Sequence, residues 1–270
     1  TIDPNRDLDS LNTELALTDL TSVERRIERT KKSAKSGDKK YNQELAVLNK
    51  LQEALNELKL VSQVELDAQE KSVLTELFLL TVKPRMYVLN VSEDALGDAN
   101  ELLEKVAAGA AVDESALSDE LKGVAKIARR AKAEGSEVAA VSARLEAELV
   151  ELPAEDAAEY LESLGLPRLG ADRVIQVGYR LLNLITFLTA GEDEVRAWTV
   201  TRGAKAPEAA GKIHSDIERG FIRAEVTSFD DFMACGSFAA ASKKGLQRLE
   251  GKEYVIKDGD IAHFRFNVGK

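Results

Sequence analysis

Apolar residues recur every three to five positions in two stretches near the start of the chain, residues 8–27 and 45–58. Side chains at this spacing fall on one side of an α-helix. The segment between the two stretches, residues 32–38, is polar and contains Gly37, which favours a turn. Two amphipathic helices joined by a short turn pair antiparallel, because each buries its apolar stripe against the other. We therefore predict a helical arm over residues 8–60.

Short apolar runs further along the chain predict buried strands. Residues 86–89 and 138–141 have the length and side-chain content of such strands, and helical patterns follow each of them, up to residue 164. A further helix is expected over residues 72–80. Alternation of strands and helices predicts parallel strands in an α/β sheet. Two strands are too few for such a sheet, so we expect more of it in a segment that precedes residue 1, where the chain begins without Met.

The pattern changes again near residue 184. Residues 185–191 and 194–200 alternate like the two strands of a hairpin, and residues 206–218 predict a helix. Further strands are expected at 224–226, 254–256 and 262–266, with a tight turn at 258–260. These elements predict a compact α+β module at the end of the chain.

Composition narrows the possible functions. The 270 residues carry 37 Lys and Arg against 47 Asp and Glu, a net charge of −10, so nucleic acid contacts require a local basic patch. The single cysteine, Cys235, excludes a disulfide framework and suits a reducing cytosol. Two histidines far apart in sequence exclude a multi-histidine metal site. No apolar run approaches the roughly 18 residues of a membrane span, so we expect a cytoplasmic protein.

Basic residues concentrate at the tip of the predicted arm. Eight Lys and Arg between residues 25 and 40 oppose only Glu28 and Asp38, which leaves +6 (8 − 2). This is either a solvated surface or a phosphate-binding tip that contacts RNA or a ribosome. A smaller basic group in the last module has the same two interpretations. The candidate contact residues are Arg25, Arg26, Arg29, Lys31, Lys32, Lys35, Lys39 and Lys40 in the arm, and Lys205, Lys212, Arg219 and Arg223 in the module.

The chain contains no glycine-rich phosphate loop. Gly211 and Gly251 precede lysines, but each lacks the earlier glycine and the following Ser or Thr of a Walker-A sequence. We therefore assign no catalytic residue and expect the chain alone to be inactive as a nucleotide hydrolase. An enzyme that uses Cys235 or His214 has no supporting group of residues around it.

Two short segments that contain polar residues follow the two predicted parallel strands, at the strand ends where ligands bind in open α/β sheets. The residues are Asn90, Val91, Ser92 and Glu93 after the first strand, and Ser142 and Ala143 after the second. They resemble the Asn-Lys-x-Asp and Ser-Ala-Lys sequences with which guanine-nucleotide proteins read the base. Val91 replaces the lysine that would stack on the base, and Glu93 replaces the aspartate that accepts both guanine donors. Losing that pair should relax or invert the preference for guanine and admit adenine. A chance Asn and Ser at two strand ends is the alternative.

Longer sequence stretches resemble the YchF or Obg-like ATPase family. They include residues 11–17, the arm, 83–93, 180–187, 194–199, 209–216, 220–225 and 255–260, and together they reach across nearly the whole chain. The resemblance implies a TRAFAC-class P-loop NTPase of the α/β class. It implies part of the parallel sheet, an inserted antiparallel helical (coiled-coil) arm and a C-terminal β-grasp, ubiquitin-like TGS domain. The corresponding divisions are 1–80 for the arm and return helix, 81–183 for the nucleotide domain and 184–270 for the TGS domain.

The same resemblance implies a ribosome-associated enzyme that hydrolyses ATP in preference to GTP. The base would meet Asn90, the backbone of Val91, Glu93, Ser142 and Ala143, whereas the phosphate loop and the Mg²⁺ ligands would lie in the absent segment. Expected partners are the ribosome or ribosomal RNA, with no membrane and no DNA specificity, and the expected state is a monomer. A non-catalytic adaptor that binds RNA or the ribosome is the alternative function.

Overall fold

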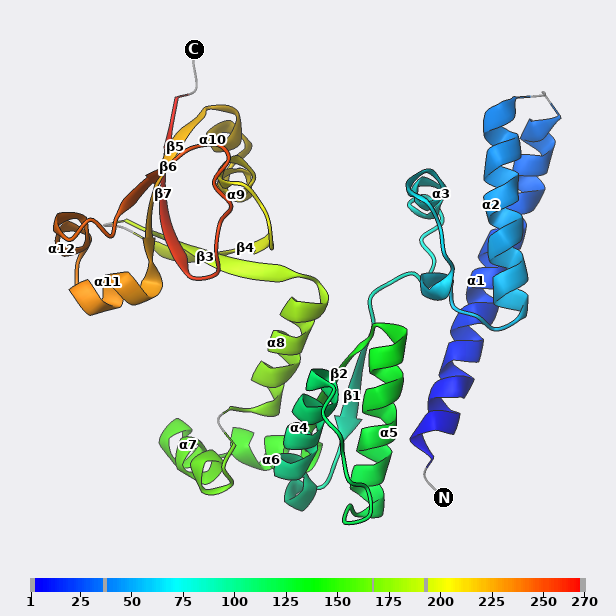
Figure 1. Ribbon diagram of the computed structural model, residues 1–270, viewed down its shortest axis with the longest axis horizontal. Coiled ribbons are helices and arrows are strands. Elements are labelled where there is room, and N and C mark those ends of the chain that lie inside the picture. Colours follow the sequence, from blue (N-terminus) through cyan, green and yellow to red (C-terminus); the bar gives the residue numbers. More distant parts are fainter. Residues whose placement is uncertain (1–2, 36–37, 167, 192–193, 268–270) are drawn as a thin grey trace. The chain divides into compact units, whose positions relative to one another are not determined.

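The computed structural model describes residues 3–35, 38–166, 168–191 and 194–267. The chain divides into two compact units, Thr1–Val177 and Gly178–Lys270. The first unit contains two apolar clusters, one within the helical arm and one beside its short sheet, and the second unit contains a third. Figure 1 labels the helices and strands of both units. Among the described residues, no helix has both the length and the apolar character needed to cross a bilayer.

The first unit begins with the predicted helical arm. Helix α1 spans Pro4–Ala34 and helix α2 spans Lys39–Asn56. The carboxylate of Asp3 accepts hydrogen bonds from the first backbone N–H groups of α1, and Asp38 does the same for α2. The helices pack through the periodic apolar residues, with Val23, Ile27, Leu48, Leu51 and Leu55 buried between them. The predicted hairpin is thus confirmed, although Ser36 and Gly37 of the predicted turn lie outside the described residues.

The segment that returns from the arm differs from its prediction. It contains a short 3₁₀ turn, Val61–Gln63, and helix α3, Ala68–Leu74. The helix predicted over 72–80 was wrong beyond Leu74, where a turn and an irregular segment follow. The buried carboxylate of Asp19, in α1, accepts hydrogen bonds from the N–H groups of Leu80 and Thr81, both at 2.8 Å. Phe78 adopts a left-handed backbone with φ of 51°, which ends any helical continuation.

A parallel two-stranded sheet forms the centre of the first unit. Strand β1 spans Met86–Asn90 and strand β2 spans Glu137–Val141, in register from Met86 opposite Glu137 to Asn90 opposite Val141. Both strands agree with their predictions. Five helices follow or connect the strands: α4 (Glu93–Ala108), α5 (Asp119–Glu134), α6 (Ala143–Val150), α7 (Ala154–Ser163) and α8 (Gly170–Leu181). Apolar residues of α4, α5 and α6 pack together with Val91 and Ala140 to form its core.

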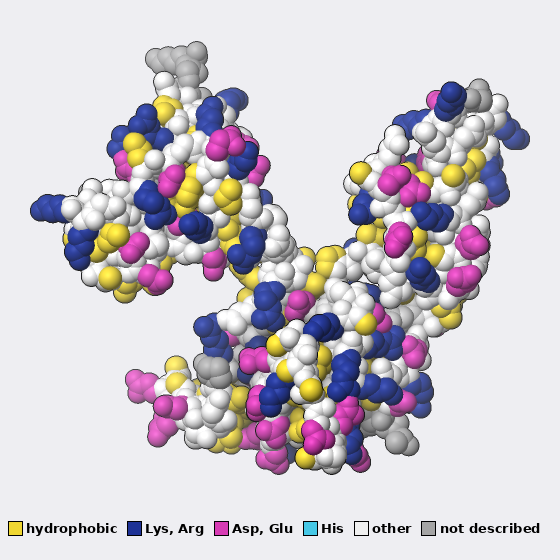
Figure 2. Space-filling view, viewed as in Figure 1, with side chains coloured by type: hydrophobic (Ala, Val, Ile, Leu, Met, Phe, Trp, Pro, Cys, Tyr) yellow, Lys and Arg dark blue, Asp and Glu magenta, His cyan; other side chains and the backbone are white. Residues whose placement is uncertain are grey.

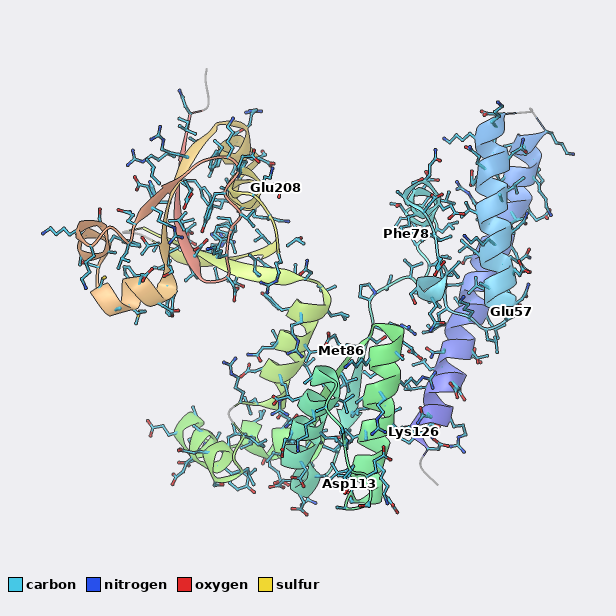
Figure 3. All side chains as sticks on the ribbon, viewed as in Figure 1. Glu57, Phe78, Met86, Asp113, Lys126 and Glu208 are labelled. Carbon is cyan, nitrogen blue, oxygen red and sulfur yellow. The ribbon has the colours of Figure 1, made fainter. Side chains whose placement is uncertain are left out.

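A polar network connects the base of the arm to β1. Arg130 of α5 forms ion pairs with Asp9 of α1 at 2.7 Å and with Glu134 at 2.8 Å. The other carboxylate oxygen of Glu134 accepts a hydrogen bond from the hydroxyl of Tyr87, in β1, at 2.7 Å. Arg85, which precedes β1, lies 3.7 Å from Glu134. Figure 3 labels Met86, at the start of the strand that receives these contacts.

The second unit contains a five-stranded mixed sheet. Its strands are β3 (Leu184–Ala190), β4 (Val195–Thr201), β5 (Phe221–Ser228), β6 (Arg248–Glu250) and β7 (Asp260–Phe266), in the order β4-β3-β7-β5-β6. The β3–β7 pair is parallel and the other pairs are antiparallel. Its helices are α9 (Ala206–Ile213), α10 (Ser215–Arg219), α11 (Phe229–Cys235) and α12 (Phe238–Lys243). Helix α9 packs against β4 and β5 over the buried core, in which the rings of Phe187 and Phe264 meet edge to face.

Two predictions for this unit need correction, and three of its elements were missed. The single helix over 206–218 is broken at His214, which has an extended backbone and accepts a hydrogen bond from the Asp216 N–H at Nδ1. Residues 254–256 form no full strand, only an isolated antiparallel bridge between Val255 and Lys205. The Tyr254 hydroxyl donates to the buried carboxylate of Asp260 at 2.7 Å. Burial and this hydrogen bond raise the pKa of Tyr254 to about 12. Helices α11 and α12 and strand β6 were not predicted, because no long periodic pattern marks them.

The Asp19 contacts generate a prediction for the return segment. Replacing Asp19 with Ala leaves two backbone donors without their acceptor in a buried place, at a cost of about 2–4 kcal/mol. Hydrogen exchange should report this as at least tenfold faster exchange of the Leu80 and Thr81 amides. Asp19→Asn keeps one acceptor oxygen and should give an intermediate rate. Unchanged exchange in Asp19→Ala would show that the carboxylate does not hold this segment.

Candidate functional site

The two predicted base-binding loops meet at the carboxyl end of the parallel sheet. Because β1 and β2 are parallel and in register, their last residues, Asn90 and Val141, lie side by side. The backbone continues this pairing, since the Val91 N–H donates to the Val141 carbonyl at 2.9 Å. The Ala143 N–H then donates to Oδ1 of Asn90 at 2.9 Å. A side chain from the first loop is thereby bonded to the backbone of the second.

A hollow of about 280 Å³ opens beside this hydrogen bond. It is lined by Asn90, Val91, Ser92, Glu93, Asp94, Ser142 and Arg144. Its size is close to the lower end of ligand pockets, roughly 300–1,000 Å³, which suits part of a nucleotide better than a whole one. Four of the five predicted base-site residues line the hollow, and the fifth, Ala143, contacts Asn90 at its edge.

Two of these residues contribute little side-chain surface. Val91 is 6% exposed, and its side chain packs among the apolar residues of α4 and α5. Ser142 is 2% exposed. The valine at the position of the stacking lysine is therefore part of the core, and this loop offers a ligand mainly backbone groups and the Asn90 amide.

Two residues that the sequence did not indicate organise the first loop. The carboxylate of Glu120, at the start of α5, accepts hydrogen bonds from the Ser92 N–H at 2.7 Å and the Ser92 hydroxyl at 2.8 Å. The Tyr160 hydroxyl, in α7, donates to Glu93 at 2.9 Å. This hydrogen bond and the charge of Glu93 raise the pKa of Tyr160, so the hydroxyl remains a donor at neutral pH. Only the tertiary fold brings these residues together, and no local pattern marks them.

Seven of the eight basic residues predicted at the arm tip lie on an exposed, charged surface, and Arg26 does not. Figure 2 shows Lys and Arg side chains around the free end of the α1–α2 hairpin. Arg26 is half-buried, and its guanidinium forms ion pairs with Glu44 at 2.6 Å and Glu76 at 2.8 Å, which raise its pKa. The other seven residues are exposed: Arg25, Arg29, Lys31, Lys32, Lys35, Lys39 and Lys40.

The four basic candidates of the second unit occupy separate places. Lys205 forms an ion pair with Glu253 at 2.6 Å, and Arg219 forms one with Asp216 at 2.5 Å. Lys212 lines a groove of about 370 Å³ between the end of β4, the loop that follows it and α9. Arg223 lies on the sheet, in β5. These four basic residues of the second unit therefore do not form a single patch.

No group of three or more His, Cys, Asp and Glu within the described ranges is arranged to hold a metal ion. These residues therefore offer no ready-made Mg²⁺ site. Cys235 is a free thiol.

Known proteins resemble this chain along almost its whole length. The family model YchF-GTPase_C, whose description reads "Protein of unknown function (DUF933)", matches residues 184–267. Ribosome-binding ATPase YchF of Bacillus subtilis is 45% identical over 269 residues, which are 99% of this chain and 68% of that protein. The Escherichia coli O157:H7 protein of the same name is 44% identical over 267 residues, with the same shares of each chain.

A solved structure adds a comparison of the fold. The YchF GTPase of Schizosaccharomyces pombe aligns with a TM-score of 0.75 and 30% identity, covering 98% of this chain and 66% of that one. This likeness confirms the predicted α/β fold of the P-loop NTPase kind. The chain spans about two thirds of the length of the relatives it matches.

Proposed function

The chain belongs to the YchF family, and we propose that it supplies the base-binding loops, the helical arm and the C-terminal module of a ribosome-binding ATPase. The family assignment confirms the resemblance expected from the sequence. The relatives are named ribosome-binding ATPases, which supports a nucleotide hydrolase that associates with the ribosome. Such a partner would place the protein in the cytoplasm.

The observation that carries the proposal is the hydrogen bond between Ala143 and Asn90. It brings the two strand-end loops together beside a hollow, at the edge of the sheet where open α/β folds bind ligands. In the proposal the free side of the Asn90 amide and the backbone at Val91 meet the edge of the base. Ser142 and Ala143 form the opposite side of the same pocket.

The contacts at this site favour adenine over guanine. Guanine offers a carbonyl oxygen, which needs a donor, and two N–H groups, which need an acceptor. The Ala143 N–H already donates to Asn90, and Glu93 already accepts from Tyr160. In the proposal guanine therefore meets a donor and an acceptor oxygen that are already engaged, and competition with these two hydrogen bonds weakens its binding. Adenine has neither that carbonyl oxygen nor those two N–H groups, and in the proposal the second lone pair of Asn90 Oδ1 accepts from its 6-amino group.

Phosphate and Mg²⁺ binding are assigned to residues outside this sequence. Its 270 residues contain no Walker-A loop, and the relatives are about half as long again. In the proposal Mg²⁺ would stabilise the charge of the phosphates when it is bound, and this chain alone would not hydrolyse ATP. A non-catalytic adaptor is the second candidate, because the exposed basic arm would by itself suffice for binding RNA.

A competition experiment tests the nucleotide preference. Unlabelled ATP and GTP would displace a fluorescent ATP analogue from the full natural protein in the presence of Mg²⁺. We expect ATP to act at an at least tenfold lower concentration, because guanine competes with the hydrogen bonds that Glu93 and Ala143 already form. Equal or stronger displacement by GTP would contradict the adenine pocket. Absence of any nucleotide binding would favour the adaptor.

Tyr160→Phe tests whether Glu93 is restrained. Removing the hydroxyl frees the carboxylate to accept guanine donors, so the ratio of the GTP Kd to the ATP Kd should fall at least threefold. Tyr179→Phe is the matched control, because its hydroxyl contacts Thr199 in the second unit instead. If both variants kept the wild-type ratio, the Tyr160–Glu93 bond would have no part in selectivity.

Charge reversal tests the arm. Arg25→Glu with Arg29→Glu removes two exposed cations one helical turn apart, and Lys122→Glu with Lys126→Glu makes the same change on α5. Ribosome co-sedimentation at several KCl concentrations should weaken at least tenfold for the arm variant only. Its salt dependence should also fall, since fewer phosphates are neutralised. An unchanged arm variant would identify the tip as a solvated surface.

A further inference from the structure

The sheet of the second unit has one face that packs on the apolar core and one face that lies opposite it. Residues of β5 and β7 alternate between the two faces. Ala224, Val226, Ala262 and Phe264 point into the apolar core. The residues between them lie on the opposite face, and we call four of them the arginine patch: Arg223 and Glu225 of β5, and His263 and Arg265 of β7.

The register places the two arginines directly opposite each other. Arg223 pairs with Arg265 and Glu225 pairs with His263, so the four residues form two adjacent cross-strand pairs. A β-bulge between Phe221 and Arg223 produces this arrangement, because Ile222 is the extra residue in β5. The bulge lets Phe221 remain in the core while Arg223 keeps its place across from Arg265.

The arrangement carries an electrostatic cost that the fold does not cancel. Like charges directly opposite each other in a sheet are destabilising. Arg265 forms an ion pair with Glu225, and within the described residues Arg223 has no hydrogen-bond or ion-pair partner. One carboxylate therefore faces two guanidinium groups. Arg223, Arg265 and His263 are exposed, so an external anion can reach all three.

We propose that the arginine patch binds the phosphodiester backbone of RNA. The proposal rests on the proposed ribosome association and assigns it a contact surface in the second unit. Each guanidinium presents a planar set of donors that matches two oxygens of a phosphate, and adjacent arginines suit adjacent oxygens of one strand. An exposed sheet face presents such donors to an extended strand, as in other RNA-binding sheets. The imidazole of His263 adds a further N–H donor beside them.

The patch differs from the basic group that the sequence indicated. Of that group only Arg223 belongs to it, because Lys205 and Arg219 are engaged in ion pairs elsewhere. Arg265 and His263 lie about 40 residues further along the chain and reach Arg223 only through strand pairing. A count of basic residues within a sequence window therefore does not find the patch.

The experiment compares two double variants of the full natural protein. Arg223→Ser with Arg265→Ser removes both arginines of the patch, and Lys243→Ser with Lys244→Ser removes two exposed charges at the end of α12. The probe is a short fluorescent single-stranded RNA, titrated at KCl concentrations from about 50 to 200 mM. We expect the patch variant to raise the Kd at least tenfold and to lower the salt slope by between one and two, with the control near wild type.

Thermal unfolding separates binding from a structural role. Removing two opposed like charges should leave the melting temperature unchanged or higher, whereas loss of a structural pair would lower it. An RNA affinity equal to that of the control, or no RNA binding by the wild-type protein, would overturn the proposal. The proposal would also be overturned if the patch variant no longer bound a fluorescent polyglutamate peptide but still bound RNA with wild-type affinity. That result would identify an acidic protein as the partner of the patch. ATP binding is measured in parallel, because its persistence shows that failure here leaves the proposed ATPase intact.

Discussion

The proposed base site depends on one contact, the hydrogen bond from the Ala143 N–H to the Asn90 side chain. It forms because two short strands are parallel and end in register, which brings two loops from distant parts of the sequence to the same edge. The apolar contacts of α4, α5 and α6 hold those strands, and Val91 belongs to the same core. The hollow is therefore a consequence of packing, and the proposed selectivity depends on which polar groups packing has already satisfied.

Polar side chains also connect strand β1 to the base of the arm. Tyr87 is three residues before Asn90, and its hydroxyl donates to Glu134, which is paired with Arg130. Arg130 in turn is paired with Asp9, in the first turns of α1. Glu134 and Arg85 are largely buried, so removing one partner would leave an uncompensated charge in a poorly solvated place. Strand β1, which carries the proposed base site, and the arm thus share one set of polar contacts within the first unit.

Much of this architecture follows from local sequence, and the exceptions have physical causes. The periodic leucines of the arm and the short runs ending at Asn90 and Val141 predict elements that the structure contains. The segment that follows α3 was not predictable, because the backbone donors of Leu80 and Thr81 bind a carboxylate from Asp19, about 60 residues away. Tyr160 and Arg265 were missed for a related reason. Their partners, Glu93 and Arg223, become neighbours only through tertiary packing or strand register.

The most direct measurement is an NMR titration of this chain with adenosine and guanosine monophosphate. Asn90 has a side-chain amide and Ala143 a backbone amide that can be observed separately, and their mutual hydrogen bond makes both sensitive to a ligand in the hollow. We predict saturable shifts of both signals with the adenine nucleotide and clearly weaker ones with the guanine nucleotide. Equal or larger shifts with the guanine nucleotide, or shifts confined to other parts of the chain, would contradict the account.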